Sequence, residues 1–324
     1  MYTLGIESSC DETSVSVVSE GRKILSNIVY SSLKEHKKYG GIVPEIAFRA
    51  QLETIAKVAN CAIEESGVSL KDIDLISVTN TPGLLGSLLI GITFAKSVSM
   101  SLGRPLLGVN HVHSHIYANF LNGENIKLPF IALVVSGGHT SLFYVKDFDK
   151  IEILGETQDD ACGEAFDKVA KILGLGYPGG PIIEKIAQKG NPKNIKFRCS
   201  GTKKPLNFSF SGIKTAVLYY YQKHKDQELD IAASFQETVI DSLISKAFLA
   251  CKVKKIKTLV IGGGVAANNR LRNKFFESAK AQGVKCFFPP KLLCMDNAAM
   301  VAGFGYRLYK KGHKSGLYLN AELN

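Results

Sequence analysis

Residues 130–145 read FIALVVSGGHTSLFYV and give the clearest indication of the fold. The apolar, β-branched run at 130–135 predicts a buried strand, residues 136–139 a turn, and residues 140–145 a strand that returns beside the first. The chain opens with the same succession of strand, polar turn and strand over residues 2–18. Two such hairpins, about 130 residues apart, predict a duplicated pair of domains whose turns face one cleft.

Longer helical patterns separate the predicted strands, which is typical of the α/β class. We place the domain boundary after residue 128, giving domains 1–128 and 129–324, with the last helix returning to the first domain. Residues 191–207 are polar and basic without periodicity, which predicts an exposed loop in the second domain. The main predicted helices span 45–65, 84–102, 212–224 and 231–253.

The composition is that of a folded, basic protein. Of 324 residues, 45% are hydrophobic and 21% charged, which excludes a disordered or fibrous chain. The net charge of +11 makes polyanions such as tRNA and nucleotides candidate partners, the alternative being a basic protein whose lysines bind nothing. Seven cysteines without Cys-x-x-Cys spacing argue against a disulfide framework and a zinc ribbon. This cysteine usage fits a reducing cytoplasm best.

No export or membrane segment is predicted. The first ten residues carry no basic region, so no signal peptide is expected. The longest uninterrupted apolar run, residues 130–135, is far shorter than a membrane span. We therefore expect a soluble, cytoplasmic protein without a membrane partner.

Three histidines cluster at residues 110–115, which read NHVHSH. If a helix begins there, His111 and His115 lie four residues apart on one face, a spacing that suits a metal site. A zinc protease would need glutamate at position 112, where this chain has valine. The alternative is a polar helix start with one capped histidine.

Asp296 is the best candidate for a third ligand. Two imidazoles and one carboxylate match a non-haem iron site, and zinc accepts the same set. The segment CMDNAAM at 294–300 also predicts the start of a helix. The alternative role of Asp296 is therefore to cap that helix.

Three glycine-rich turns are candidate anion-binding loops, because glycine lets backbone amides approach a phosphate closely. They lie at 136–140, at 176–181 and at 262–265, and the last runs into a helix through Asn268. Taken singly, each is typical of an ordinary turn. No Walker motif is present and no Gly-x-Gly-x-x-Gly motif follows a predicted strand, which argues against a P-loop or Rossmann nucleotide site.

Together these motifs resemble those of the tRNA threonylcarbamoyladenosine transferases, formerly described as O-sialoglycoprotein endopeptidases, and of their bacterial branch. The resemblance spans almost the whole chain. The matching stretches are 5–14 (GIESSCDETS), 39–45 (YGGIVPE), 82–88 (PGLLGSL), His111 with His115, 136–140, 163–175, 177–181, 208–215 (FSFSGIKT), 262–268 and 296–300.

The resemblance implies an actin-like ATPase fold, in which two duplicated RNase H-like α/β domains enclose a nucleotide. It implies an acyltransferase that moves the threonylcarbamoyl group from threonylcarbamoyl-AMP to N6 of adenosine 37, just 3′ of the tRNA anticodon, forming t6A. It assigns one Fe²⁺ per subunit, or zinc, to His111, His115 and Asp296. It implies that the adenylate or ATP is bound by Val134, Val135, Ser136, Gly137, Gly138, Asp167, Gly180, Glu184 and Asn268. Of these, Asp167 is expected to contact the ribose.

Asp11, in the first turn, is our candidate for the general base or for the group that orients the adenine amine. Its alternative role is to brace the turn by bonding backbone amides. Asp167 can equally serve as the partner of Lys171 in an ion pair on a helix surface. Two positions depart from the resemblance: His113 stands where bacterial relatives usually have glutamate, and Gln51 where many have histidine, a change that we expect to be neutral.

The resemblance also implies partners: tRNA and two small bacterial proteins, a shortened paralogue and an ATPase. The alternative function is that of an actin-like ATPase or small-molecule kinase. Such kinases use an aspartate base with loosely held magnesium and need no imidazole ligands. The paired histidines therefore favour the transferase.

Overall fold

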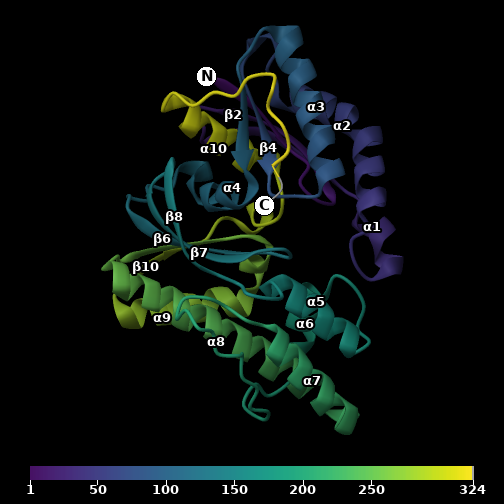
Figure 1. Cartoon of the computed structure of the whole chain (residues 1–324), viewed down its shortest axis with the longest axis vertical. Coiled ribbons are helices and arrows are strands. Elements are labelled where there is room, and N and C mark those ends of the chain that lie inside the picture. The colour runs from purple at the N-terminus through teal and green to yellow at the C-terminus, as the bar shows by residue number, and fades with distance from the viewer. Residues whose placement is uncertain (323–324) are drawn as a thin grey trace. The chain divides into compact units, whose positions relative to one another are not determined.

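The computed structural model describes residues 1–322 and divides them into two compact units (Figure 1). Unit 1 comprises Met1–Ile126 and the chain from Met295 onwards, and unit 2 is Lys127–Cys294. The boundary expected from sequence lay after residue 128, and the expected second domain ran to the end of the chain. In the structure the last helix, α10 (Ala298–Lys310), contacts β1, β2 and β4 of unit 1.

The sheet of unit 1 has five strands in the order β3-β2-β1-β4-β5. The central strand, β1, pairs antiparallel with β2 and parallel with β4, while β2–β3 is antiparallel and β4–β5 parallel. The helices α2 and α3 pack on the strands, and α4 follows β5 directly. The bounds are β1 (Tyr2–Glu7), β2 (Glu12–Ser19), β3 (Lys23–Ser31), β4 (Ile73–Thr81), β5 (Leu106–Asn110), α1 (Leu33–His36), α2 (Pro44–Ser66), α3 (Leu85–Leu102) and α4 (His111–Tyr117).

Unit 2 repeats the same sheet. Its central strand, β6, pairs antiparallel with β7 and parallel with β9, and β8 and β10 are the edges in the order β10-β9-β6-β7-β8. The duplication predicted from the two hairpins is thereby confirmed. The bounds are β6 (Phe130–Val135), β7 (Thr140–Asp147), β8 (Lys150–Glu156), β9 (Thr258–Gly262), β10 (Lys285–Phe287), α5 (Cys162–Ile172), α6 (Gly179–Ala187), α7 (Ser211–Lys223), α8 (Glu228–Lys254) and α9 (Asn269–Gln282).

The predicted helices differ from the observed α2, α3, α7 and α8 by at most three residues at either end. The predicted loop at 191–207 contains no helix or strand. Sequence analysis named only the strands that correspond to β1, β2, β6 and β7, and missed the other six. The edge strands β3 and β8 have largely exposed residues and no clean alternation. The buried β4 and β9 are short apolar runs without a hairpin partner next to them in the sequence. Short 3₁₀ turns lie at Lys37–Tyr39, Leu70–Asp72, Ala118–Gly123, Lys225–Gln227, Gly264–Ala267 and Lys291–Leu293.

Helix α3 is long and apolar enough to cross a membrane by length and composition alone. Its sequence contains no long uninterrupted apolar run, because serines and Lys96 interrupt it, so no membrane span was predicted there. In unit 1 it packs against β4 and α2, with Leu88 and Ile92 in the core. This is the packing of a helix that covers a sheet.

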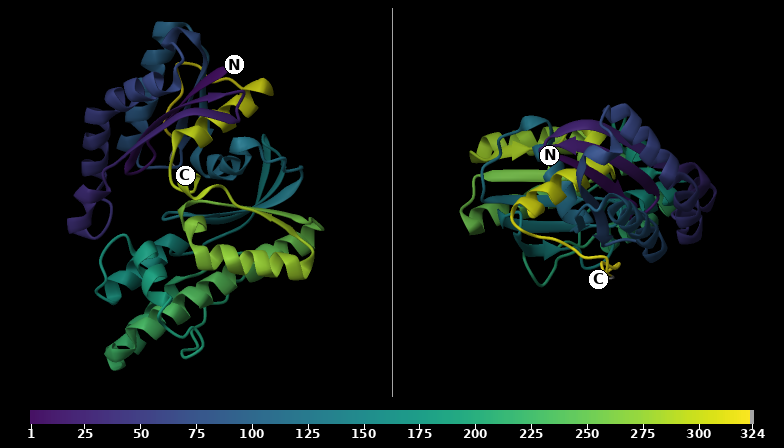
Figure 2. Two further views of the ribbon diagram at one scale, coloured as in Figure 1. Left: turned by 180° about the vertical axis from the view of Figure 1, so that it is seen from behind. Right: turned by 90° about the horizontal axis from the view of Figure 1, so that it is seen from above.

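The two faces of β1 bury different helices, because successive side chains of a strand point to opposite faces. Leu4 and Ile6 belong to the core formed with α2 and α3. Gly5, between them, lies against α10: a Cβ on Gly5 would be 2.8 Å from the Cβ of Ala302 and would also overlap the carbonyl oxygen of Ala298. Figure 2 shows the yellow α10 beside the purple N-terminal strands. The absence of a side chain at Gly5 thus lets α10 dock closely.

We predict that Gly5→Ala lowers the free energy of unfolding of unit 1 by about 1–3 kcal/mol, since the added methyl group overlaps backbone atoms of α10. The measurement is hydrogen exchange of the β1 and α10 amides in denaturant. Gly41→Ala is the matched control, because a Cβ there meets no atom within 4 Å. Equal stability of the two variants would show that the contact of β1 with α10 is not tight.

Candidate metal centre and glycine-rich turns

The histidine cluster opens α4, as the sequence predicted. Asn110 ends β5 and caps the helix, its side-chain oxygen accepting the backbone N–H of His113 at 3.0 Å. His111 and His115 therefore share a face, with ring centroids 4.7 Å apart and planes at 79°. His113 lies elsewhere, with its ring edge-on to Phe304 of α10 at 6.2 Å.

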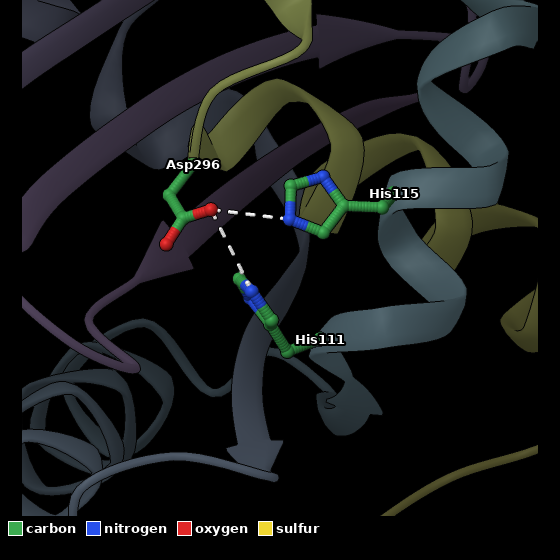
Figure 3. A group of neighbouring side chains, drawn as sticks. All are labelled: His111, His115 and Asp296. Carbon is green, nitrogen blue, oxygen red and sulfur yellow. Dashed lines mark ion pairs between the residues drawn. The ribbon is translucent and has the colours of Figure 1, made fainter. Parts of the chain in front are cut away.

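Asp296 joins the two histidines from the segment that precedes α10 (Figure 3). Its Oδ1 lies 3.1 Å from Nε2 of His115 and 3.6 Å from Nε2 of His111. The three candidate ligand atoms lie within 4.8 Å of one another. Both imidazoles are buried, with exposed fractions of 5% for His111 and 0% for His115. The structure thus brings together the three residues that sequence analysis selected.

Asp296 does not cap α10, so the alternative role considered for it was wrong. The cap is Asn297, whose side chain accepts the backbone N–H of Met300 at 3.1 Å. Two neighbouring residues with the same capping chemistry made this assignment ambiguous from sequence alone. The Asp296 carboxylate is directed instead at the histidines.

Glu7 is a buried partner of His111 that sequence analysis missed. Its Oε2 lies 3.0 Å from Nδ1 of His111 and accepts the hydroxyl of Thr79 at 2.6 Å. Its Oε1 accepts the backbone N–H of Ser9 at 2.6 Å. We assign the Nδ1 proton of His111 to this carboxylate, which leaves Nε2 directed at Asp296. The available signal was an acidic residue at the end of a largely buried strand.

Charges in this region favour a bound cation. Burial alone lowers the pKa of His111, but the charges of Glu7 and Asp296 and the hydrogen bond to Glu7 raise it to about 9. Burial alone raises the pKa of Glu7, but His111 outweighs it and holds the pKa below its usual value. Burial and the charges of Asp296 and Asp11 raise the pKa of Glu12 well above its usual range. A positive charge near Glu7, Glu12 and Asp296 would stabilise the ionised forms of these three acids.

The side chains fit a transition metal. Among the described residues, neither ring nitrogen of buried His115 has a hydrogen-bond partner, and its Nε2 faces Asp296 without hydrogen-bond alignment. An orphaned buried nitrogen is costly unless a bound group such as a metal ion contacts it. Two imidazole nitrogens and a carboxylate oxygen, with Glu7 orienting one imidazole, form a donor set that iron and zinc accept.

Asp11 lies in a braced turn between β1 and β2. Its backbone carbonyl accepts the N–H of Ser32 at 3.0 Å and the hydroxyl of Ser32 at 2.9 Å. Among the described residues, no backbone amide donates to its carboxylate, so the bracing role considered for that side chain is not seen. Burial and the charge of Asp11 raise the pKa of the Cys10 thiol well above its usual range.

Gln51 holds the same turn, so its exchange for the histidine of many relatives is more than a surface change. Its Nε2 donates to the carbonyls of Ser8, Cys10 and Glu12 at 3.3, 2.9 and 3.0 Å, and the side chain is fully buried. One amide group thereby fixes the backbone around Asp11. The side chain of Gln51 supplies both hydrogens of its NH₂ group to this task.

The first glycine-rich turn joins β6 to β7, as predicted. The N–H of Ser136 donates to the carbonyl of His139 at 2.8 Å, and its hydroxyl accepts the N–H of His139 at 3.1 Å. Val134 and Val135 precede it in the buried strand, so only their backbone can meet a ligand. The N–H of Gly163, at the start of α5, donates to the carbonyl of Ser136 at 3.0 Å. Gly137 and Gly138 follow Ser136, and a Cβ on either would meet no atom within 4 Å.

Three further candidate side chains of unit 2, those of Asp167, Glu184 and Asn268, have structural partners. Asp167 accepts the N–H of Gly179 at 2.6 Å, which ties α5 to the start of α6, and the adjoining Gly180 is open on its side-chain face. Glu184 accepts both the backbone and the side-chain N–H of Asn269, at 2.8 and 2.7 Å. Asn268 caps α9 by accepting the N–H of Leu271 at 2.9 Å. These contacts place Asp167 beside Gly180, and Glu184 beside the start of α9.

Residues 23–303 match the family described as tRNA N6-adenosine threonylcarbamoyltransferase. The chain belongs to this family. A relative of that name from Dictyoglomus turgidum is 52% identical over 328 residues, which cover 99% of this chain and 97% of the relative.

Two solved structures show the fold. Full-length HypF, in a phosphate- and nucleotide-bound form, superimposes with a TM-score of 0.65 at 16% identity, covering 97% of this chain and 56% of HypF. Component A of the (R)-2-hydroxyglutaryl-CoA dehydratase of Acidaminococcus fermentans superimposes with a TM-score of 0.59 at 15% identity, covering 96% of this chain and 99% of that protein. Both have the actin-like ATPase fold, which confirms the fold class predicted from sequence.

We predict that Asn297→Ala lowers the free energy of unfolding of the chelator-treated protein by about 1 kcal/mol, because α10 loses its cap. Asp296→Asn is the matched neighbour and should change this free energy by less than about 0.5 kcal/mol. Chemical denaturation of the two variants in the presence of chelator makes the comparison. An equal loss for both would give Asp296 a structural role.

Proposed function

We propose that this protein transfers the threonylcarbamoyl group from threonylcarbamoyl-AMP to N6 of adenosine 37 in tRNA, forming t6A. The observation that carries this conclusion is the family match over residues 23–303, supported by a relative 52% identical along 99% of the chain. The protein is then a transferase that acts on tRNA. An ATPase or small-molecule kinase is not favoured, because the similarity of this chain to solved structures of the actin-like ATPase fold extends only to the fold.

His111, His115 and Asp296 hold the metal in this proposal. Their convergence within 4.8 Å and the unpartnered nitrogens of His115 support it. Fe²⁺ is the expected ion, and zinc accepts the same ligands. Such an ion supplies Lewis acidity and charge neutralisation for a phosphate or acyl oxygen. Glu7 then acts as a positioning residue, because it fixes the orientation of the His111 ring.

The turn of Ser136, Gly137 and Gly138 binds the phosphate of the adenylate through backbone amides, together with the backbone of Val134 and Val135. The absence of side chains at the two glycines supports this role, since it leaves the amides open to close approach. In the same proposal Asp167 accepts a ribose hydroxyl, while Gly180, Glu184 and Asn268 complete the adenylate contacts. The hydrogen bonds of Asp167 and Asn268 to helix starts hold these side chains in fixed positions.

The chemistry requires positioning more than a strong nucleophile. The adenine amine is a weak nucleophile, but the mixed anhydride of threonylcarbamoyl-AMP is already activated. N6 forms a bond to the carbamoyl carbon, the bond from that carbon to the phosphate oxygen breaks, and AMP leaves with the electron pair. Asp11 orients the amine and accepts its proton. Gln51 and Ser32 support this assignment, because they fix the backbone on both sides of Asp11.

The proposal includes a cytoplasmic location and two small partner proteins, a shortened paralogue and an ATPase. The family's activity on tRNA supports the cytoplasmic location. The partners rest on the resemblance of the sequence to the bacterial branch of the family. Assays of the chain should therefore be run with and without those proteins.

The test of the proposed function is mass spectrometry of tRNA nucleosides. We expect t6A after unmodified tRNA is incubated with threonine, bicarbonate, ATP, an adenylate-forming synthase, the partner proteins and this chain. Asp11→Asn should lower the rate by about 100-fold or more, the usual contribution of a general acid or base. If the complete mixture makes AMP but no t6A, the function is wrong.

For the metal, we predict one tightly bound transition-metal ion per chain, which His111→Ala and His115→Ala both lose. His113→Ala is the matched control on the same helix, because its ring packs against Phe304, and it should keep the full content. Elemental analysis after gel filtration gives the stoichiometry. Magnesium alone in the wild-type protein would support the kinase alternative instead.

A further inference from the structure

The net positive charge of the chain lies entirely in unit 2. Unit 2 carries 26 Lys and Arg against 15 Asp and Glu, whereas the rest of the chain has 14 of each. The net charge of +11 is therefore a property of Lys127–Cys294, and unit 1 is neutral. A polyanionic partner will be attracted to unit 2.

One segment concentrates this charge. Residues 191–207, here called the basic loop, read NPKNIKFRCSGTKKPLN and contain five basic residues and no acid. All five side chains are exposed, and none forms an ion pair with any residue that the structure describes. Several other cations of unit 2, such as Lys168, Lys214 and Lys274, are neutralised by carboxylates. The five basic residues are Lys193, Lys196, Arg198, Lys203 and Lys204.

The basic loop is held in place although it has no regular secondary structure. At its start, Asp230 of α8 accepts the N–H of Asn191 and the side-chain N–H of Asn194, both at 2.7 Å. At its end, Lys246 of α8 donates to the carbonyls of Pro205, at 3.4 Å, and of Asn207. An irregular segment of this length is uncommon unless it has a function. The loop presents its cations on a fixed surface, which lowers the entropy lost on binding.

The shape and polarity of the loop favour a nucleic acid over a membrane. A hollow of about 440 Å³ lies between the loop and α8, lined in part by Phe197, Arg198 and Lys246. A half-buried aromatic ring beside a guanidinium is typical of sites that stack on bases. The loop exposes no large apolar side chain, which an interfacial membrane anchor would need.

We propose that the basic loop is the surface on which unit 2 holds the phosphate backbone of the tRNA. This inference rests on the proposed function, which supplies the RNA. The loop contributes affinity that does not depend on base sequence, because lysines contact phosphates as point charges. Its cations are docking residues and take no part in the transfer step.

The experiment compares two variants of the full-length chain with equal charge. The loop variant changes Lys193, Lys196, Arg198, Lys203 and Lys204 to Gln. The control variant changes five other exposed lysines of unit 2 that have no ion pair with a described residue, also to Gln: Lys252, Lys255, Lys257, Lys280 and Lys285. Affinity for unmodified tRNA is measured by filter binding over a series of salt concentrations. Thermal unfolding checks that both variants are folded.

We expect the loop variant to bind tRNA at least tenfold more weakly than the control variant at about 100 mM salt. The slope of log affinity against log salt should become less steep by about 3.5–4.5, since each of five phosphate contacts contributes about 0.7–0.9. The control variant should change the slope by less than about 1. Replacing the four loop lysines by Arg keeps the charge and should leave the affinity within about twofold of wild type.

Equal tRNA affinity and equal salt slope for the loop and control variants would overturn the inference. Binding of both variants to vesicles containing phosphatidylserine is also measured. If the loop variant loses vesicle binding while its tRNA affinity is unchanged, the loop is a membrane-binding surface and the inference is overturned. Synthesis of t6A by the wild-type chain is measured separately. If the wild type makes t6A but the loop and control variants bind tRNA equally well, the proposed function stands and only the inference about the loop fails. If the wild type binds tRNA through the loop but makes no t6A, the proposed function fails.

Discussion

The docking of α10 on the sheet of unit 1 determines whether the histidines meet their third partner. Asp296 directly precedes the helix, so its position follows from where α10 begins. The first amides of α10 donate to Ser14 of β2, at 2.9 Å, and to Asn27 of β3, at 3.2 Å. Gly5 lets the helix approach β1 closely. Small and polar residues on three strands thus place a carboxylate beside α4, which is 181 residues away in the sequence from His115.

The same region shows how a protein keeps several acids close together inside a folded domain. Glu7 is almost completely buried, yet the N–H of Ser9, the hydroxyl of Thr79 and the imidazole of His111 compensate for its lost solvation. Glu12 has no such set of donors, and its pKa rises well above the usual range because of burial and the charges of Asp296 and Asp11. The charge of His111, together with the hydrogen bonds from His111 and Thr79, therefore keeps Glu7 ionised, and Glu12 has no such cation beside it. The charge that would benefit the remaining acids is that of a metal ion.

Much of this arrangement was accessible from the sequence, because the signals are local. The two hairpins, the main helices and the i, i+4 spacing of His111 and His115 all depend on periodicity over a few residues. Asp296 lies beside the two histidines, as expected, but its distinction from Asn297 as the cap of α10 required the direction of each side chain. Glu7 and Gln51 were missed because their partners lie on other elements: the ring of His111 in one case and three carbonyls of the first turn in the other. The edge strands β3 and β8 were missed because exposure removes their pattern, and the buried strands β4 and β9 because a short apolar run does not distinguish a strand from a helix.

The two units have the same sheet topology, but they differ in how the chain forms them. Unit 2 is a continuous segment, whereas unit 1 begins at the first residue and needs the chain beyond Met295. On the ribosome, the second sheet has all of its strands while the first still lacks the helix that covers Gly5. A nascent or truncated chain that stops before residue 296 holds two imidazoles and no carboxylate to join them. A metal ion held by all three side chains, as proposed above, would therefore be incorporated only after synthesis of nearly the whole polypeptide.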